Sequence, residues 1–213
     1  MTQEYFNEHI QGFLLEYERN TIERDHSFDY CQLYFHQHYG DFLTNNLEQS
    51  CFVLWGYLAG FGMLRGSSLR TKNPSALVPV IEYIAANDLY DIDLDDYQNQ
   101  NDRERVITAY SGIENALHHL NPSHTLISKI ILGVYSCLPA LDSYFLEFVR
   151  NEWHLRFRYN HLEDLNVIMQ RMYQECEQIQ FPILYLRQFD GQDSEIQMKK
   201  IRLIDRVGWE LGA

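Results

Sequence analysis

The chain has 213 residues, and its 46% hydrophobic and 22% charged content is typical of a folded protein, which excludes the disordered and fibrous classes. Its net charge of −13 argues against a general nucleic-acid-binding surface. The charge is uneven: residues 1–102 hold 16 acids and 5 bases, whereas residues 103–171 hold 7 of each. The acidic half has a simple role in solubility, and the C-terminal half can still present a local basic face.

The chain shows neither a membrane segment nor a disulfide pattern. Its longest uncharged apolar stretch, residues 51–64, is too short to cross a bilayer, and the first residues lack the blocks of a signal peptide. The four cysteines are widely spaced within apolar stretches, so we expect buried free thiols in a reducing compartment. We therefore expect a cytoplasmic protein without metal or other cofactor.

Helical periodicity dominates the chain from its first residues onward. Helices are predicted over residues 3–18, 28–45 (with Ser27 as N-cap), 47–65, 74–87, 103–119, 123–136, 139–149, 162–178 and 194–207. The acidic stretch 88–102 is predicted as a surface loop or lobe boundary, and residues 181–186 as an isolated strand. The fold class is therefore all-α, with about nine helices in one domain, 1–213. Two lobes, 1–100 and 101–213, with a cleft between them are an alternative.

The third predicted helix, 47–65, is apolar nearly all round and is expected to be central. It continues into a stripe of small residues that favours tight helix packing and, as the alternative, close approach of a ligand. Trp55 is a candidate for the core or for a pocket wall. Arg65 and Ser67, near the end of this helix, are polar groups that could face a cleft.

Residues 117–136 predict two helices joined by a tight turn. A helix ends near His119, the turn Leu120-Asn121-Pro122 follows, and Ser123 caps the second helix, whose first residues include His124 and Thr125.

A single carboxylate follows this pair of helices. Asp142 is the only acid in residues 115–146, and it comes three residues after Pro139, near the start of another helix. Backbone N–H groups and the helix dipole stabilise a negative charge at such a position.

This pattern resembles the helix-hairpin-helix DNA glycosylase superfamily. In that family a hairpin presents backbone amides to a DNA phosphate, and its second helix leads to a P-x-x-D segment whose aspartate is catalytic. Leu138-Pro139-Ala140-Leu141-Asp142 is similar to that segment. The resemblance covers about 30 residues, with an approximate match in length and helix number over the rest.

The chain departs from the family pattern in two places. The family hairpin is usually rich in glycine, whereas Leu120 and Pro122 stand here, so the phosphate contact would rely on the amides of Ser123, His124 and Thr125. Eighteen residues before Asp142, in the slot of the reactive lysine of strand-cleaving members, the chain has His124. The resemblance therefore implies a monofunctional enzyme.

The resemblance implies hydrolysis of an N-glycosidic bond in double-stranded DNA. Asp142 would stabilise the positive charge that builds on the sugar and orient water, and the target nucleotide would be flipped into a pocket. The resemblance also suggests a bacterial defence enzyme that removes a modified base, such as glucosylated cytosine, from phage DNA. Proposed pocket walls are Trp55, Arg65, Ser67, Tyr144 and Trp153.

Basic and aromatic residues alternate after Asp142, in residues 150–159. The basic side chains of such a segment can contact phosphates, and its aromatic rings can stack on nucleobases. The same pattern also suits an ordinary amphipathic connection. The candidate DNA contacts are Lys129, Arg150, Arg156 and Arg158. A second basic group (Lys199, Lys200, Arg202 and Arg206) is expected on a solvated helix face.

Two other functions remain open. The first is a non-enzymatic helical binding or regulatory protein whose acidic N-terminal half docks a basic partner. The second is a small helical RNase that uses Arg156 and His161. The sequence does not specify an oligomeric state.

Overall fold

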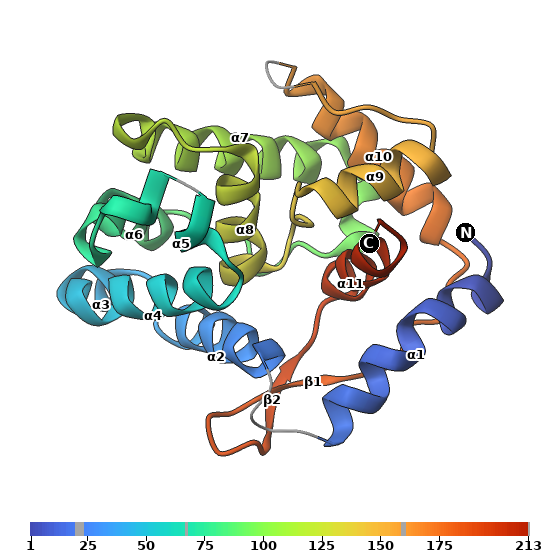
Figure 1. Ribbon diagram of the computed structural model, residues 1–213, viewed down its shortest axis with the longest axis horizontal. Coiled ribbons are helices and arrows are strands. Elements are labelled where there is room, and N and C mark those ends of the chain that lie inside the picture. Colours follow the sequence, from blue (N-terminus) through green and yellow to red (C-terminus); the bar gives the residue numbers. More distant parts are fainter. Residues whose placement is uncertain (20–23, 67, 159–160, 213) are drawn as a thin grey trace.

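The computed structural model describes residues 1–19, 24–66, 68–158 and 161–212, and in this part of the chain the protein is all-α (Figure 1). Eleven α-helices and one two-stranded sheet are present among the described residues. The α-helices are α1 (Gln3–Arg19), α2 (Arg24–Gln37), α3 (Asp41–Asn45), α4 (Leu47–Gly60), α5 (Met63–Gly66), α6 (Val78–Ala86), α7 (Gln100–Ala116), α8 (His124–Tyr135), α9 (Ser143–Glu152), α10 (Glu163–Cys176) and α11 (Lys200–Gly212).

Helix α8 is the most buried element, and it occupies the place that the sequence analysis gave to the third helix. Every residue of α8 is buried except Thr125 and Lys129, and the helix packs against α2, α4 and α7. The prediction of a central helix at 47–65 is wrong, because α4 exposes Phe52 (55%) and Gly56 on one side. The stripe of small residues packs only in part: a Cβ added at Gly56 would meet nothing within 4 Å, whereas one added at Gly60 would lie 3.4 Å from Ser27 Oγ of α2, an ordinary contact distance.

Glycines with positive φ divide two of the predicted helices. Gly40 (φ 72°) separates α2 from α3, and Gly62 (φ 79°) lies between α4 and α5. Glycine adopts this left-handed region without the steric cost that a Cβ brings. Ser27 lies inside α2, where its Oγ donates to the carbonyl of Arg24 (2.6 Å), so its predicted N-cap role is wrong.

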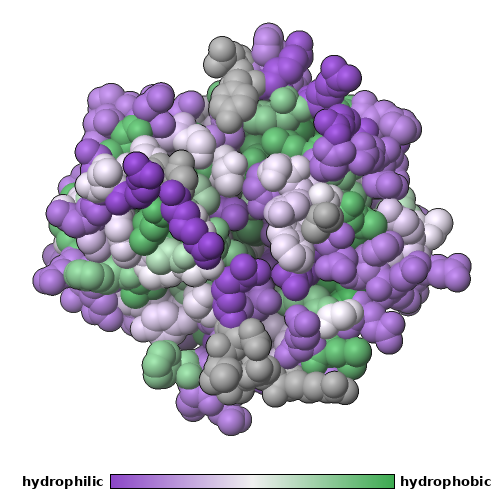
Figure 2. Space-filling model, in the orientation of Figure 1, coloured by the Kyte–Doolittle hydropathy of each residue, from purple (hydrophilic) through white to green (hydrophobic). Residues whose placement is uncertain are grey.

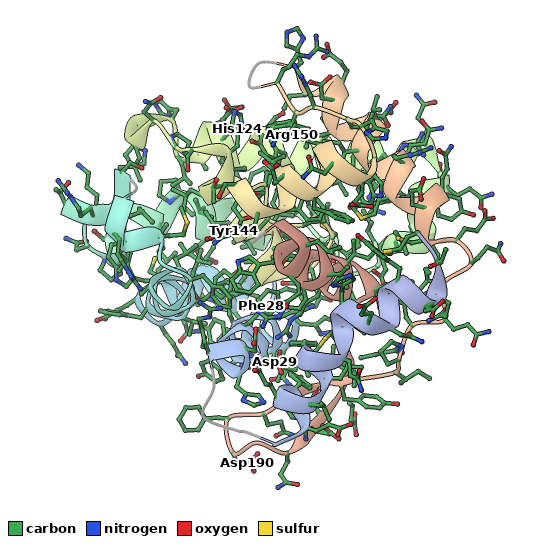
Figure 3. All side chains as sticks on the ribbon, turned by 45° about the vertical axis from the view of Figure 1, so that its right-hand side comes forward. Phe28, Asp29, His124, Tyr144, Arg150 and Asp190 are labelled. Atoms are coloured by element: carbon green, nitrogen blue, oxygen red, sulfur yellow. The ribbon has the colours of Figure 1, made fainter. Side chains whose placement is uncertain are left out.

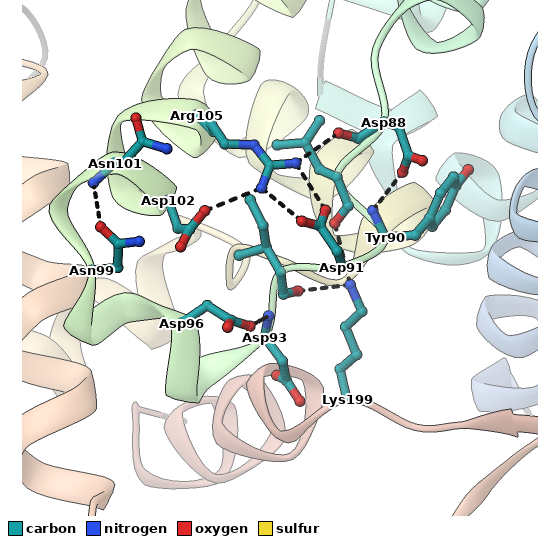
Figure 4. Close-up of polar contacts among 12 residues, drawn as sticks. Asp88, Tyr90, Asp91, Asp93, Asp96, Asn99, Asn101, Asp102, Arg105 and Lys199 are labelled. Atoms are coloured by element: carbon teal, nitrogen blue, oxygen red, sulfur yellow. Dashed lines mark hydrogen bonds and ion pairs between the residues drawn. The ribbon is translucent and has the colours of Figure 1, made fainter.

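The acidic stretch 88–102 is held in place at both ends, as Figure 4 shows. Arg105 donates to both carboxylate oxygens of Asp91 (2.7 and 2.8 Å) and to Asp102 (3.1 Å). Lys199 Nζ donates to the carbonyl of Ile92 (2.7 Å), and the 3-10 helix Leu94–Gln98 lies in the middle of the stretch. The predicted surface loop is therefore a connection that Arg105 and Lys199 anchor, and part of it is a 3-10 helix.

The C-terminal part contains a hairpin followed by a helix. Strand β1 (Tyr185–Arg187) pairs antiparallel with β2 (Asp193–Gln197). The strand predicted as isolated at 181–186 thus has a partner, and it begins only at Tyr185. The predicted helix 194–207 begins too early, because its first residues form β2. Helix α11 begins at Lys200, and the carboxylate of Asp93 accepts from the N–H groups of Lys200 (3.0 Å) and Ile201 (3.2 Å) at its N-terminus.

Helix α11 lies between α9 and α1 (Figure 1), and it contacts both. Its approach to α9 is close because Gly208 faces two buried rings: an added Cβ would lie 2.5 Å from Phe145 Cδ2 and 3.2 Å from Phe148 Cδ1. The chain therefore uses glycine for tight packing at α9–α11 and not at Gly56 of α4.

The buried apolar side chains form one cluster that draws on segments from Phe6 to Val207. All four cysteines are free and buried. Within the described residues, no helix is both long and apolar enough to cross a membrane. Figure 2 shows hydrophilic side chains over most of the face seen in Figure 1, with smaller apolar areas between them.

Candidate active site

Asp142 is the N-cap of α9, in the connection that follows α8. Its Oδ1 accepts the N–H of Phe145 (3.1 Å), and its Oδ2 lies 3.5 Å from Lys129 Nζ. The two charged side chains are mostly shielded, with exposed fractions of 17% for Asp142 and 14% for Lys129. A helix N-terminus and a neighbouring ammonium group both stabilise negative charge on this carboxyl group.

The connection between α8 and α9 is fixed by the polar side chains of α8. Thr125 Oγ1 donates to the carbonyl of Leu141 (3.1 Å), and Ser128 Oγ accepts the N–H of Leu141 (2.8 Å). Lys129 lies on α8, as do Thr125 and Ser128. Because α8 is central and buried, these bonds hold Asp142 at a fixed distance from Lys129.

Asp142 and Lys129 line a cavity of about 240 Å³. Its walls combine six aromatic rings with basic and acidic groups. The lining residues come from α1, α2, α4, α8, α9 and α11 and from the connections after α4 and α8. The lining residues are Phe13, Arg24, Asp25, Phe28, Tyr57, Phe61, Lys129, Leu132, Ala140, Asp142, Tyr144, Arg202, Asp205, Arg206 and Trp209. Tyr144 is 40% exposed and meets Trp209 edge-on (5.6 Å between ring centroids).

A second carboxyl group enters the cavity from α11. Asp205 Oδ1 accepts the N–H of Ala140 (2.7 Å), two residues before Asp142 in the chain. Burial raises the pKa of Asp205 to about 7, and the negative charge of Asp142 adds to the increase, while the Ala140 hydrogen bond, Lys129 and Arg202 oppose it. Groups that titrate near neutrality inside a cavity are candidates for acid–base chemistry.

A buried ion pair supports the α11 wall of the cavity. The Arg202 guanidinium donates to the carboxylate of Asp29 and lies over the ring of Phe28, 3.9 Å from its centroid. Asp29 is fully buried, and it also accepts from the hydroxyl of Tyr17 and from the N–H of Arg187 (2.9 Å). Both of its oxygens thus accept hydrogen bonds from α1, β1 and α11, which holds α11 in position beside the cavity.

Two further arginines at the cavity lie on aromatic rings. Arg24 is 5.1 Å from the ring centroid of Phe61, and Arg206 is 4.9 Å from that of Trp209. The expected solvated basic face is thus wrong for Arg202, which is 4% exposed, and Arg206 also lines the cavity.

His124 lies away from the cavity, within the packing of α7 and α8. Its Nδ1 is hydrogen-bonded to the hydroxyl of Tyr110, and its ring meets Phe157 edge-on (5.1 Å). Burial lowers the pKa of His124. Ser123 caps α8 by accepting the N–H of Leu126 (3.2 Å), as predicted, and it does not line the cavity.

The arginines predicted to contact DNA after Asp142 point to neighbouring acids or to solvent. Arg150 pairs with Glu147, and Arg158 pairs with Asp164 (2.8 Å), while Arg156 is exposed. In Figure 3, His124 and Arg150 lie on one side of Tyr144, and Phe28 and Asp29 lie on the other. Of the candidate DNA contacts, the structure brings Lys129 to the cavity and leaves the three arginines outside it.

Of the predicted pocket walls, Tyr144 lines the cavity. Trp153 is buried against Phe145 and Phe148, Trp55 is partly buried in α4, and Arg65 is exposed, and none of these three lines it. Ser67 lies outside the described residues.

The histidine of the alternative RNase site is half-exposed. His161 pairs with Glu163 (2.9 Å), and neither His161 nor Arg156 belongs to the cavity. Within the described ranges, no group of three or more His, Cys, Asp or Glu side chains is arranged to hold a metal ion.

Asp205 and Trp209 line the cavity although the sequence pattern did not mark them as site residues. Asp205 follows Arg202 by three residues on an otherwise apolar helix face, so it lies on the same side of α11. An acid three residues after an arginine on an apolar helix face was the signal available in the sequence. It was not used, because the nearby basic residues suggested a solvated basic face.

Comparisons with protein-family models, with curated proteins and with solved structures found no significant match. The assignment of function therefore depends on the chemistry of the cavity.

Proposed function

We propose that this protein is a DNA glycosylase that hydrolyses the N-glycosidic bond of a nucleotide flipped into the cavity. The observation that supports this most is that Asp142 lies beside Lys129 in a cavity with aromatic walls. A catalytic carboxylate, rings for a base and cations for phosphates are the groups that this reaction needs.

Asp142 would act on the sugar. As the base leaves, positive charge builds on the deoxyribose ring, and a carboxylate held next to C1′ stabilises it. The same carboxylate can accept a proton from the attacking water. Lys129 and the Phe145 N–H keep the carboxylate in place for this role.

The rings would hold the base. Tyr144 and Trp209 are partly open to solvent at the cavity, and Phe28 and Phe61 lie deeper or next to cations. Stacking between aromatic side chains compensates a flipped base for its lost neighbours in the duplex. The contact of a phosphate with the start of α8, at Ser123–Thr125, stays a prediction.

We further propose that the base is a modified one and that the enzyme acts against phage DNA, with glucosylated cytosine as the first candidate. This part of the proposal depends on the family resemblance. Room for a bulky base would come from the cavity itself and not from the glycines of α4, because Tyr57 is the α4 residue that lines it.

The direct test is base release from DNA. Plain duplexes and duplexes with modified bases are incubated with the protein, and alkali then cleaves the strand at abasic sites. We expect the wild type to produce such sites and Asp142→Asn to be slower by roughly 10²–10³-fold, because the amide cannot carry negative charge. Asparagine is also a good N-cap, so α9 should remain folded.

The matched control is Asp190→Asn in the hairpin, which lies far from Tyr144 in Figure 3 and should keep the wild-type rate. An Asp142→Asn protein as fast as the wild type would rule out the mechanism. Tight binding of DNA or of a protein partner without base release would favour the binding-protein alternative. RNA cleavage lost in His161→Ala would favour the RNase.

Lys129 allows a test of the monofunctional reaction. An amine that attacks C1′ forms an imine that borohydride reduces to a permanent protein–DNA bond. We expect no such adduct, because Lys129 Nζ is held by Asp142 and by the carbonyl of Phe61 (3.4 Å). An adduct that disappears in Lys129→Gln would show strand-cleaving chemistry instead.

A further inference from the structure

We propose that Asp205 is a second catalytic residue, which donates a proton to the departing base while Asp142 stabilises the sugar. This inference rests on the proposed glycosylase function and adds the requirement that the substrate base needs a proton to leave. Asp205 enters the cavity from α11, whereas Asp142 enters it from the N-terminus of α9.

The hydrogen bonds of Asp205 leave one oxygen available. Its Oδ1 accepts the N–H of Ala140 (2.7 Å), and among the described residues no other group donates to this carboxyl group. The bond also joins α11 to the segment that ends at Asp142. The two carboxyl groups are thus held in one cavity by the same short stretch of backbone.

The surroundings of the two carboxyl groups differ in a way that suits different roles. Asp142 has the Lys129 ammonium at 3.5 Å, whereas Asp205 has a neutral backbone N–H as its hydrogen-bond partner. Burial, with help from the charge of Asp142, raises the pKa of Asp205 to about 7, so much of it holds a proton near neutrality. Carboxyl groups in such contrasting surroundings act as the acid and the stabilising anion of one reaction.

Several other charged or titratable groups face the same cavity and set this balance. They are Lys129 of α8, Asp142 before α9, Tyr144 of α9, Tyr57 of α4, Arg24 and Asp25 of α2, and Arg202 and Arg206 of α11 itself. Of these groups, Lys129 and Arg202 lower the pKa of Asp205, and Asp142 raises it.

The proposed step balances as follows. The C1′–N bond breaks and its electron pair stays with the base, while the carboxylic acid of Asp205 gives its proton to a ring nitrogen or carbonyl oxygen of that base. A water oxygen then bonds to C1′, and its proton passes to the Asp142 carboxylate. Asp142 releases that proton to solvent and Asp205 takes one up, so one water is consumed for each base released.

The test compares bases that do and do not require a proton. A neutral base leaves as an anion unless it is protonated, whereas 7-methylguanine is already cationic in DNA and leaves as a neutral molecule. We expect Asp205→Asn to slow release of a neutral base, with glucosylated cytosine as the first candidate, by roughly 10²–10⁴-fold. Release of 7-methylguanine should slow by less than about threefold. The asparagine oxygen can still accept the Ala140 N–H, so the segment before Asp142 keeps its position.

The pH dependence gives a second readout. For the neutral base, the wild-type rate should fall as the pH rises above about 7, where Asp205 loses its proton, and this decline should be absent in Asp205→Asn. Asp205→Glu keeps an acid and should recover part of the rate. If 7-methylguanine is not accepted, the pH profile and the Glu variant decide the question.

The outcomes separate the inference from the function. If the wild type releases no base, the glycosylase proposal and this inference both fail. If the wild type is active and Asp142→Asn is not, but Asp205→Asn slows both bases equally or keeps the wild-type pH profile, Asp205 is a structural residue and only this inference is overturned.

Discussion

Asp142 and Asp205 are the same residue type in one cavity, and their surroundings make them different. Asp142 lies against an ammonium group and a helix N-terminus, while Asp205 is half-buried on α11 and has a raised pKa. The sequence singled out Asp142 as a candidate, because it is the only acid in residues 115–146 and follows a proline, and its catalytic role stays a prediction. The sequence did not single out Asp205, whose surroundings depend on helices that are distant in the chain.

The raised pKa of Asp205 predicts how stability changes with pH. Because the pKa is near 7 in the folded protein and about 4 in the unfolded chain, the folded state holds the extra proton between these values. This contribution to stability is present below about pH 4 and is lost as the pH rises towards 7 and beyond. Asp205→Asn removes this pH dependence. The unfolding free energy of the variant minus that of the wild type should therefore rise by on the order of 2–4 kcal/mol from pH 4 to pH 8.

Urea unfolding at pH 4, 6 and 8 checks this prediction. The control is Asp190→Asn, whose difference from the wild type should stay the same at each pH. Parallel stability curves for the wild type and Asp205→Asn would contradict the raised pKa.

Counting along the chain misplaced one residue of the site. His124 occupies the sequence slot of the family lysine, but its ring is used by Tyr110 and Phe157. Lys129, five residues further along α8, is the residue that reaches Asp142. A slot counted from a resemblance indicates the direction of a side chain only where the turn before the helix has the same geometry, and this turn has Leu120 and Pro122 where the family that it resembles has glycines.

Two glycines show how differently two helices use a missing side chain. Gly208 of α11 lies against Phe145 and Phe148, and an added Cβ would lie 2.5 Å from Phe145 Cδ2. Since both rings are buried, we expect Gly208→Ala to cost about 1–3 kcal/mol of stability. Gly56 of α4 has open space around it, so Gly56→Ala should stabilise the protein by up to about 1 kcal/mol.

Thermal or urea unfolding of the two variants measures both effects under the same conditions. A neutral Gly208→Ala would show that α9 and α11 can separate without cost. A destabilising Gly56→Ala would show that α4 packs more closely than described.

At the level of elements, local signals predicted most helices and failed where distant parts of the chain decide. The apolar period of α1 and the Ser123 cap of α8 depend on neighbours in sequence, and both were predicted. The polar sequence of β2 lacks a strand pattern, and it becomes a strand because it pairs with β1. Gly40 and Gly62 could have been read as helix breaks, but the apolar periodicity continues across them.

At the level of the whole molecule, Asp29 joins three segments that are far apart in the chain. It accepts from Tyr17 of α1, from the backbone of Arg187 in β1 and from Arg202 of α11. Asp29→Ala leaves the Arg202 charge buried without this partner, which should cost about 3–5 kcal/mol. Asp193→Ala removes a pair with Arg187 whose acid is 57% exposed, so it should cost less than about 1 kcal/mol.

Chemical unfolding of these two variants compares a buried ion pair with an exposed one. A third variant, Asp29→Asn with Arg202→Met, removes both charges and should lose less stability than Asp29→Ala. Equal losses in Asp29→Ala and Asp193→Ala would show that the buried pair does not secure α11.

The cavity could not be predicted from the sequence, because its walls come from residues between Phe13 and Trp209. Composition and periodicity predicted the all-α class. The segment around Asp142, which the sequence singled out, forms one wall of the cavity. Which faces meet depends on tertiary packing, such as the contact of α11 with α9 and α1.

Helix α11 follows every other wall of this cavity in the chain, and it supplies four of the lining residues: Arg202, Asp205, Arg206 and Trp209. On the ribosome, the segment with Asp142 is therefore made and can begin to fold before the last wall exists. A translation product that stops after β2 would contain Asp142 and Lys129 but no enclosed site. Under the proposed function, incomplete copies would be harmless to the DNA of the cell that makes them.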